Sequence, residues 1–495
     1  MSQNLAAIDL GSNSFHLLVV QDRGDEVLVV DKMRERVRLA AGLTKQNRLR
    51  SNARKAALSC LEVFGQRIAN IPNHHVRAVG TNTLRKLGRT GLFMEEAEAA
   101  LGRRIEIISG LEEARLIYLG VSHVLADATE TRLVVDIGGG STECIVGRGP
   151  QIQRSDSLFM GCVDMTNSHF ATGEFSRDNV SQAIVAARLE LGSIHRVYKS
   201  FSWSKAYGCS GTIHAVSRVL LAAGRSESGL ITAEGVNWLI ERLLCAKRIA
   251  RLSLPGLKAE RLPVFAGGVC ILAAIFKSLG LKEMQPVGAA LREGLVQQLR
   301  GAGFDVDLRE RTIRRFVGRY AADRHQADRV ARVALDIGNQ VFKTWDLDAE
   351  SSRRLLRWAS DLHEVGKAIN YAGYHRHGAY LVANSDMSGF SRDEQNALAT
   401  LLLGQRRKLV LSRLMQYGGS RTAELLPMVI IFRLSRRLNR TRSPTPRPEL
   451  EVTARPCGLH LAFPAGWLLD RPLTTAELVG EAEQLQEVGY TLTWS

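Results

Sequence analysis

Short apolar runs alternate with amphipathic helical patterns along the first third of the chain. Apolar runs of this length bounded by turn residues are typical of β-strands, and apolar residues three and four positions apart are typical of helices. The alternation predicts an α/β fold. The expected strands are residues 5–10, 17–20, 27–30, 76–79 and 105–108, and the expected helices are residues 52–71 and 93–101.

The pattern restarts after a polar segment at residues 126–131. A second hairpin is expected at residues 132–137 and 142–146, and helical patterns follow at residues 181–198 and 232–251. Each of the two halves therefore opens with a predicted strand pair and continues with helices.

From about residue 305 the sequence predicts a series of helices that contain many arginines. The segment 443–448 (SPTPRP) interrupts this pattern because proline breaks a helix, and the apolar runs 459–463 and 490–494 then predict strands of a small cap. The expected organisation is four domains: α/β domains at residues 1–126 and 127–304, an all-α domain at 305–443, and a C-terminal α+β cap at 449–495.

The composition adds a strongly basic character. The 495 residues carry a net charge of +16, which attracts nucleic acid, an anionic membrane or a polyphosphorylated small molecule. The arginine-rich helices lack aromatic interleaving and a known recognition motif, so we expect no specific nucleic-acid partner. The seven cysteines form no C-x-x-C pair, no signal peptide is evident, and the longest apolar stretch, residues 264–276, is too short to span a bilayer. A cytoplasmic protein without a membrane partner is expected.

Two glycine-rich segments with the same spacing carry the candidate chemistry. Residues 7–15 (AIDLGSNSF) and 135–143 (VDIGGGSTE) each end an apolar strand on Asp, at Asp9 and Asp136, with Gly two residues later and Ser five residues later. Glycine lets backbone N–H groups approach an anion, and an Asp at the strand end can hold Mg²⁺ together with phosphate oxygens. The repeat predicts two phosphate-binding loops with these members: Gly11, Ser12, Asn13, Ser14, Gly138, Gly139, Gly140, Ser141 and Thr142.

The paired loops resemble those of the actin/hexokinase (ribonuclease H-like) superfamily, whose two halves clamp phosphates between them. The chain as a whole resembles the exopolyphosphatase/guanosine pentaphosphate phosphatase family in its long, four-domain form. This resemblance implies duplicated actin-like domains, an HD-like helical domain, the cap, a homodimer and removal of terminal phosphate. Its motifs are AIDLGSNSFH (7–16), VRLAAGL (37–43), TLR (83–85), IISGLEEAR (107–115), VVDIGGGSTE (134–143), SGT (210–212), LREGL (291–295), LHEVG (362–366) and LATLLLGQ (398–405).

The resemblance also suggests roles for individual residues. The second glutamate of a Glu-Glu pair, Glu113, matches the family's catalytic glutamate and would orient and deprotonate the attacking water. Asp136 would anchor Mg²⁺, Glu143 would share the metal or help place the water, and Asp9 is either a metal or water contact or a structural turn residue. Arg85 is the candidate for neutralising charge on the transferred phosphoryl group.

One position departs from the family pattern. The family usually has Ala two residues and Asn four residues after this arginine, where the present chain has Leu87 and Arg89. An extra arginine beside the cleft favours a more highly charged substrate. Arg89, Gly211 and Thr212 are expected at the edge of the substrate site.

The helical half resembles HD-type metal phosphohydrolases at His363-Glu364. A metal site of that type needs an upstream His, a His-Asp pair and a later Asp. Here the upstream position is Gln326, with His325 one residue away, and the Asp is replaced by Glu364. We therefore expect an HD-like fold without its metal, whose arginines guide a multiply charged phosphate chain towards the cleft.

Two substrates fit the same chemistry: guanosine pentaphosphate, hydrolysed to the tetraphosphate, and the ends of inorganic polyphosphate. The motif sequences VRLAAGL and LATLLLGQ and the short cap favour guanosine pentaphosphate. An actin-like or sugar-kinase-like ATPase is another possibility, with Gly267–Gly268 as a relic of an adenosine pocket. A non-catalytic alarmone sensor is a further alternative, although the intact Glu113 and Asp136 do not favour it.

Overall fold

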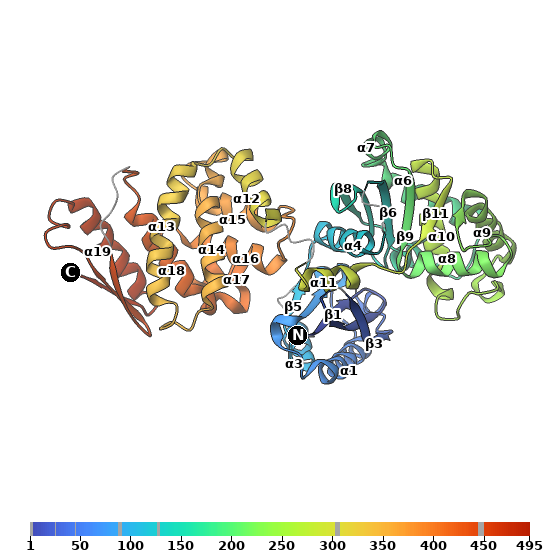
Figure 1. Cartoon of the computed structure of the whole chain (residues 1–495), viewed down its shortest axis with the longest axis horizontal. Helices are drawn as coiled ribbons and strands as arrows, with labels where there is room; N and C mark the ends of the chain where they lie inside the picture. Colours follow the sequence, from blue (N-terminus) through green and yellow to red (C-terminus); the bar gives the residue numbers. More distant parts are fainter. Residues whose placement is uncertain are drawn as a thin grey trace. The chain divides into compact units, whose positions relative to one another are not determined.

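The computed structural model describes residues 3–24, 26–44, 46–87, 92–125, 129–301, 307–443 and 450–495. The chain divides into two compact units, Met1–Asp305 and Val306–Ser495 (Figure 1). Apolar side chains form separate buried clusters in the two units.

The first half of the N-terminal unit is built on a five-stranded sheet with the order β3-β2-β1-β4-β5. Strand β1 is apolar from Leu5 to Ile8 because this stretch is covered on both faces. Its residues Ala6 and Ile8 belong to one core, and Leu5 and Ala7 belong to another. The elements are β1 (Gln3–Leu10), β2 (Phe15–Asp22), β3 (Val27–Glu35), α1 (Ser51–Ile68), β4 (Val76–Gly80), α2 (Asn82–Leu87), α3 (Leu92–Leu101) and β5 (Ile105–Ile107).

The second half repeats this topology in a six-stranded sheet with the order β10-β11-β9-β6-β7-β8. In both sheets the first strand pairs antiparallel with the second and parallel with a later strand, so the predicted duplication and α/β class are confirmed. The strands are β6 (Thr131–Ile137), β7 (Thr142–Arg148), β8 (Gln151–Leu158), β9 (Lys205–Cys209), β10 (Ile231–Thr232) and β11 (Glu283–Pro286). The helices are α5 (Cys162–His169), α6 (Arg177–Gly192), α7 (His195–Ser200), α8 (Ser210–Ala222), α9 (Ala233–Ala246) and α10 (Leu262–Leu279).

Helices α4 (Gly110–Val124) and α11 (Leu291–Leu299) share a core with residues of both sheets. A Cβ at Gly294 would lie 1.9 Å from the Leu116 carbonyl oxygen, and one at Gly120 would lie 2.3 Å from the Ala290 carbonyl oxygen. The two helices therefore cross at a distance that only glycine allows.

Helix α10 differs from the prediction made for its apolar stretch. It spans 18 residues and is long and apolar enough to cross a membrane, and no other helix in the described ranges is. The prediction that this segment is too short to span a bilayer is therefore wrong. However, 67% of its apolar window is buried inside the protein, and a core helix passes the same test, so this is weak evidence for a membrane span.

The glycine pair of α10 packs against α5 and α8. A Cβ at Gly267 would lie 2.5 Å from Thr166 Oγ1, and one at Gly268 would lie 2.4 Å from Thr212 Cγ2. Close helix packing therefore accounts for the pair, and an adenosine pocket is not needed to explain it.

In the residues that the structure describes, the C-terminal unit consists of seven α-helices followed by a three-stranded sheet in the order β12-β13-β14 with one further helix. Leu459 and Leu461 of the sheet share one core with Val429 of a helix, which joins the cap to the helices. The elements are α12 (Asp307–Arg319), α13 (Arg324–Val341), α14 (Ala349–Leu362), α15 (Tyr374–Asn384), α16 (Arg392–Gly404), α17 (Leu411–Gly418), α18 (Thr422–Leu438), β12 (Glu451–Arg455), β13 (Gly458–Ala462), α19 (Pro472–Gln486) and β14 (Thr491–Trp494).

The helical pattern 181–198 is split between α6 and α7, and the pattern 232–251 stops being α-helical where Lys247 adopts a φ of 60°. The strands β8, β9, β10, β11 and β12 were not predicted. The four-domain division stays a prediction. Its boundaries at 126/127 and 304/305, and residues 444–448 of the predicted linker, lie outside the described residues.

Candidate active site

The two predicted loops are the turns of two equivalent hairpins. Strands β1 and β2 place Asp9 opposite His16, and strands β6 and β7 place Asp136 opposite Glu143. In the first loop a Cβ on Gly11 would lie 3.0 Å from the Ser14 carbonyl oxygen. In the second, a Cβ on Gly138 would lie 3.1 Å from the Ser141 carbonyl oxygen. The spacing shared by the two sequences thus produces the same local backbone shape.

The two loops lie against each other. A Cβ on Gly139 would be 3.0 Å from the Ser12 Cβ, so a larger residue there would push the loops apart. The start of α2 holds them in place: Asn82 Nδ2 donates to the Gly140 carbonyl oxygen at 2.9 Å, and Thr83 Oγ1 donates to Ser12 Oγ at 2.8 Å.

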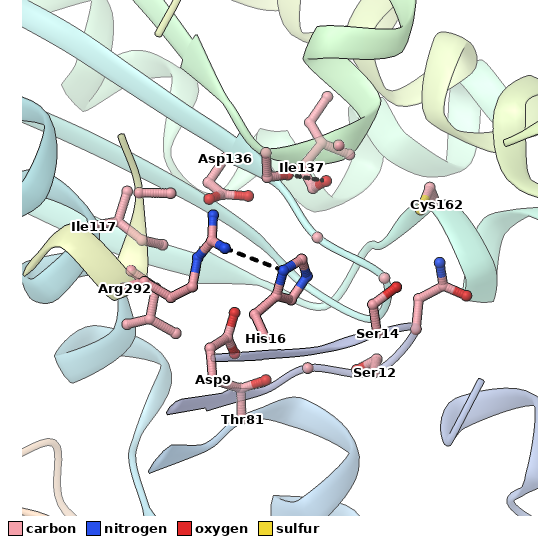
Figure 2. A pocket seen from close by; sticks show the side chains of 18 of the residues that line it. Asp9, Ser12, Ser14, His16, Thr81, Ile117, Asp136, Ile137, Cys162 and Arg292 are labelled. Atoms are coloured by element: carbon pink, nitrogen blue, oxygen red, sulfur yellow. Dashed lines mark hydrogen bonds between the residues drawn. The ribbon is translucent and has the colours of Figure 1, made fainter. Parts of the chain in front are cut away.

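Both loops line a cavity of about 350 Å³ (Figure 2). The carboxylates of Asp9, Glu113 and Asp136 line it, and so do five basic side chains. A cavity that presents carboxylates beside arginines and backbone N–H groups suits a phosphate chain together with a cation. The basic residues are Lys32, Arg34, Arg218, Arg261 and Arg292.

The two neighbouring glutamates of α4, Glu112 and Glu113, have different surroundings. Ser109 caps the helix, since its Oγ accepts a hydrogen bond from the Glu112 N–H at 3.2 Å. Glu112 is fully buried and is bound by Arg115 at 2.7 and 2.8 Å. Glu113 instead lines the cavity and accepts a hydrogen bond from Arg85 Nη1 at 2.9 Å. Glu113 is therefore the glutamate that can meet a ligand.

Burial raises the pKa of every carboxyl group at the base of the cavity. The pKa of Asp9 rises to about 7 and that of Asp136 to about 6, with the charge of Glu113 adding to burial in both cases. Burial also raises the pKa of Glu113, although Arg85 opposes the shift. The pKa of Glu143 lies well above its usual range because burial and the charges of Glu113 and Asp136 act together. This excess of negative charge favours a bound cation.

Arg292 supplies part of the compensating charge. Figure 2 shows its side chain extending between Asp9 and Asp136 towards His16. Its Nη1 donates to His16 Nδ1 at 3.3 Å. Burial, followed by the charge of Arg292, lowers the pKa of His16 to about 2, so His16 is neutral and can accept this bond. Arg292 also acts to lower the pKa of Asp9.

Several predicted residues do not reach the cavity. The Thr142 hydroxyl donates to the Met160 carbonyl oxygen at 2.6 Å, which corrects the expectation that it is a free phosphate donor. Glu143 is buried and accepts a hydrogen bond from Ser157 Oγ at 2.7 Å, so it lies behind the cavity lining. Arg85 likewise lies behind Glu113 and also donates to the Ile108 carbonyl oxygen at 2.8 Å.

The residues expected at the edge of the substrate site line the cavity only in part. Gly211 lines the cavity, whereas Thr212 is buried beneath it against Gly268. Arg89 lies outside the described residues. The other predicted loop members line the cavity: Gly11, Ser12, Asn13, Ser14, Gly138, Gly139, Gly140 and Ser141.

The basic wall of the cavity was missed at the sequence level. Arg292 lies within the quoted motif LREGL and could have been assigned from it. Lys32, Arg218 and Arg261 come from separate elements and belong to no quoted motif. Their convergence follows only from the topology of the two sheets.

Comparison with protein families gives two matches along the chain. The model of the Ppx/GppA phosphatase family matches residues 18–301, and the model of Ppx/GppA phosphatase domain III matches residues 308–482. A guanosine-5'-triphosphate,3'-diphosphate pyrophosphatase of Aeromonas hydrophila is 40% identical over 485 residues, covering 98% of this chain and 97% of the relative. A protein of the same name from Pseudoalteromonas translucida is 36% identical over 487 residues, covering 98% and 97%.

Solved structures with the same fold cover 60–61% of the chain. An exopolyphosphatase from Cytophaga hutchinsonii has a TM-score of 0.55 at 23% identity and covers 61% of this chain and 99% of its own. The Ppx/GppA enzyme of Aquifex aeolicus has a TM-score of 0.51 at 21% identity and covers 60% and 100%. At these identities the likeness shows a common fold.

Proposed function

The chain belongs to the Ppx/GppA phosphatase family, and from this membership we propose that it releases terminal orthophosphate from guanosine pentaphosphate, leaving the tetraphosphate. Inorganic polyphosphate is the second candidate substrate, because its ends present the same phosphoanhydride bond. The observation that carries the proposal is the cavity at which two equivalent loops, Glu113 and five basic side chains meet. Relatives at 36% and 40% identity that are named for the guanosine substrate support the first choice.

The two loops provide hydrogen-bond donors for phosphate binding. Backbone N–H groups of glycine-rich turns, with the hydroxyls of Ser14 and Ser141, offer donors to phosphate oxygens. Ser14 Oγ is buried without a hydrogen-bond partner, so it is a donor available to a ligand. The arginines that line the cavity can each bind two oxygens of the same phosphate chain. Together they would hold the terminal phosphate next to Glu113.

Glu113 is the proposed general base. Its carboxylate takes a proton from water while the water oxygen forms a bond to the terminal phosphorus. The bond from phosphorus to the bridging oxygen breaks, and the leaving phosphate keeps the electron pair. Burial raises the pKa of Glu113, and a carboxylate with a raised pKa is a more effective proton acceptor than an exposed glutamate. Arg85 opposes that shift and fixes the carboxylate in position by a hydrogen bond of 2.9 Å.

The carboxylates fit a divalent cation such as Mg²⁺. Asp9 and Asp136 line the same cavity, and burial, together with the nearby charge of Glu113, raises the pKa of both. No three His, Cys, Asp or Glu side chains in the described ranges form a complete metal-binding group, which suits a cation that takes most of its ligands from phosphate and water. We propose Asp9 and Asp136 as its protein ligands, with Glu143 behind them. When bound, Mg²⁺ neutralises charge on the phosphate oxygens.

The test is orthophosphate release from guanosine pentaphosphate and from long-chain polyphosphate in the presence of Mg²⁺. We expect Glu113→Gln to lower kcat by about 10²–10⁴-fold with little change in folding, because only the proton acceptor is lost. The matched control is Glu112→Gln, which should lower stability by loosening Arg115 while the folded fraction stays active. Equal activity of Glu113→Gln and wild-type protein would refute the assignment. The ratio of the two substrate rates decides between the substrates.

The homodimer and the cytoplasmic location implied by the resemblance are part of this proposal. Light scattering of the purified protein and fractionation of cells would test them.

A further inference from the structure

A single carboxylate, Glu260, joins the two halves of the N-terminal unit at the edge of the catalytic cavity. It belongs to the second half, where it lies two residues before helix α10. Its Oε1 lies 3.5 Å from Arg34 Nη1, and its Oε2 lies 3.2 Å from Arg36 Nη2. These arginines belong to the first half, where Arg34 is on β3 and Arg36 directly follows that strand. Arg34 also lines the cavity, whereas Arg36 and Glu260 do not, so the two ion pairs lie at its boundary.

Positive charge is in excess around Glu260. Burial lowers the pKa of Arg34 and of Arg261, nearby arginines lower both further, and Glu260 opposes both shifts. In the ranges that the structure describes, Arg218 and Arg261, which also line the cavity, form no ion pair with a carboxylate. Glu260 therefore balances only part of the positive charge at this edge of the cavity.

A second ion pair also joins the two halves, but it lies away from the cavity. Lys86 Nζ of α2 lies 3.0 Å from Asp164 Oδ2 of α5, and neither residue lines the cavity. The two side chains are 43% and 38% exposed, close to the 35% and 36% of Arg34 and Glu260. The two ion pairs therefore differ mainly in that Arg34 can meet a ligand in the cavity.

A phosphate chain in the cavity and Glu260 offer Arg34 the same kind of partner. Guanidinium groups form charge-assisted hydrogen bonds with carboxylates and with phosphates alike. An ion pair exposed to this extent is weak because water screens it, so a ligand with several charges can replace it. Arg36 holds Glu260 beside Arg34 from the other side. Glu260 is thus placed where it can occupy Arg34 until a phosphate group takes its place.

We propose that Glu260 is a specificity-determining residue that competes with the substrate for Arg34. The inference rests on the proposed function: with the terminal phosphate next to Glu113, Arg34 is left for a phosphate group further along the chain. A ligand of several linked phosphates displaces Glu260 and gains this arginine. Orthophosphate occupies the terminal position alone and leaves the ion pair intact. Glu260 therefore favours phosphate chains over a single phosphate, because only a chain brings enough charge to replace it.

The test is calorimetric titration of the full-length protein carrying Glu113→Gln, which prevents turnover, in the presence of Mg²⁺. The ligands are tripolyphosphate and, separately, orthophosphate. Adding Glu260→Gln should lower the Kd of tripolyphosphate by about 3–10-fold, because a competing carboxylate of modest strength is removed. The Kd of orthophosphate should change by less than about twofold. Loss of a contact that only supports the start of α10 would lower the unfolding temperature without raising affinity.

The matched control is Asp164→Asn, which removes a carboxylate of similar exposure that also joins the two halves. Its Kd for both ligands should stay within about twofold of the parent. A double-mutant cycle shows whether Glu260 acts through Arg34. In an Arg34→Gln background, Glu260→Gln should change the Kd of tripolyphosphate by less than about twofold.

Unchanged or weaker tripolyphosphate binding in Glu260→Gln would overturn the inference, and so would an equal gain with orthophosphate or in Asp164→Asn. If Glu260→Gln unfolds at a lower temperature than the parent, Glu260→Asp, whose side chain is one methylene shorter, replaces it and should tighten binding in the same direction. Orthophosphate release by the wild-type protein is measured separately. Release with unchanged binding in Glu260→Gln would support the proposed function and refute the inference, whereas tighter binding without release would do the reverse.

Discussion

The crossing of α4 and α11 joins the segment that carries Glu113 to the segment that carries Arg292. A Cβ at Gly294 would lie 1.9 Å from the Leu116 carbonyl oxygen, whereas real Cβ contacts below 3.0 Å are essentially never seen. The atom that would be met belongs to the backbone, so no side-chain rotation can relieve the clash. Gly294→Ala must therefore move the helices apart by about 1 Å, the difference between these two distances.

The size of the effect follows from two opposing contributions. Overpacking of this kind costs about 1–3 kcal/mol, while replacing a helical glycine by alanine gains up to about 1 kcal/mol. We expect a net loss of about 1–2 kcal/mol in the free energy of unfolding. A displacement of about 1 Å near reacting groups can cost roughly 100-fold in rate, so kcat/KM should fall by about 10–100-fold.

The measurements are urea unfolding and kcat/KM for orthophosphate release. The matched control is Gly192→Ala at the end of α6, where a Cβ would meet no atom within 4 Å. This control should be as stable as wild type or slightly more stable, and fully active. Gly294→Ala with wild-type unfolding midpoint and kcat/KM would show that the crossing does not position the two segments.

Two further predictions concern charge in the cavity. Arg85→Gln removes the charge that opposes the raised pKa of Glu113, so the acidic limb of the pH–rate profile should move to higher pH. Arg85→Lys should move it less, and an unchanged limb in Arg85→Gln would contradict the proposed pairing. Because folding raises the pKa of Asp9 from 3.8 to about 7, its contribution to stability is present below pH 3.8 and is lost as pH rises towards 7. The Tm of the metal-free protein should therefore fall over this pH range, and the fall should be smaller in Asp9→Asn. Addition of Mg²⁺ should raise the Tm most at high pH. Identical profiles of Tm against pH for the two proteins would refute this reasoning.

The fold class and the loops could be predicted because both depend on local pattern. The strand runs of residues 5–10 and 132–137 are apolar since both faces are buried, and the glycine spacing after Asp9 and Asp136 sets the loop geometry. Helix ends were less predictable. Helix α9 stops where Lys247 adopts a left-handed conformation, a choice that the helical periodicity of its sequence does not reveal.

Sequence alone thus determined the duplicated α/β architecture, the two loops and the glutamate pair, because backbone conformation and apolar periodicity depend on residues that are close together in the sequence. The resemblance singled out Glu113, and the tertiary structure shows that it faces the cavity whereas Glu112, one position earlier on α4, is bound by Arg115. Only the tertiary structure brought Lys32, Arg218 and Arg292 to one cavity, and only it showed that the Thr142 hydroxyl donates to the Met160 carbonyl oxygen. Charges from distant segments converge through sheet topology, and no local pattern records that convergence.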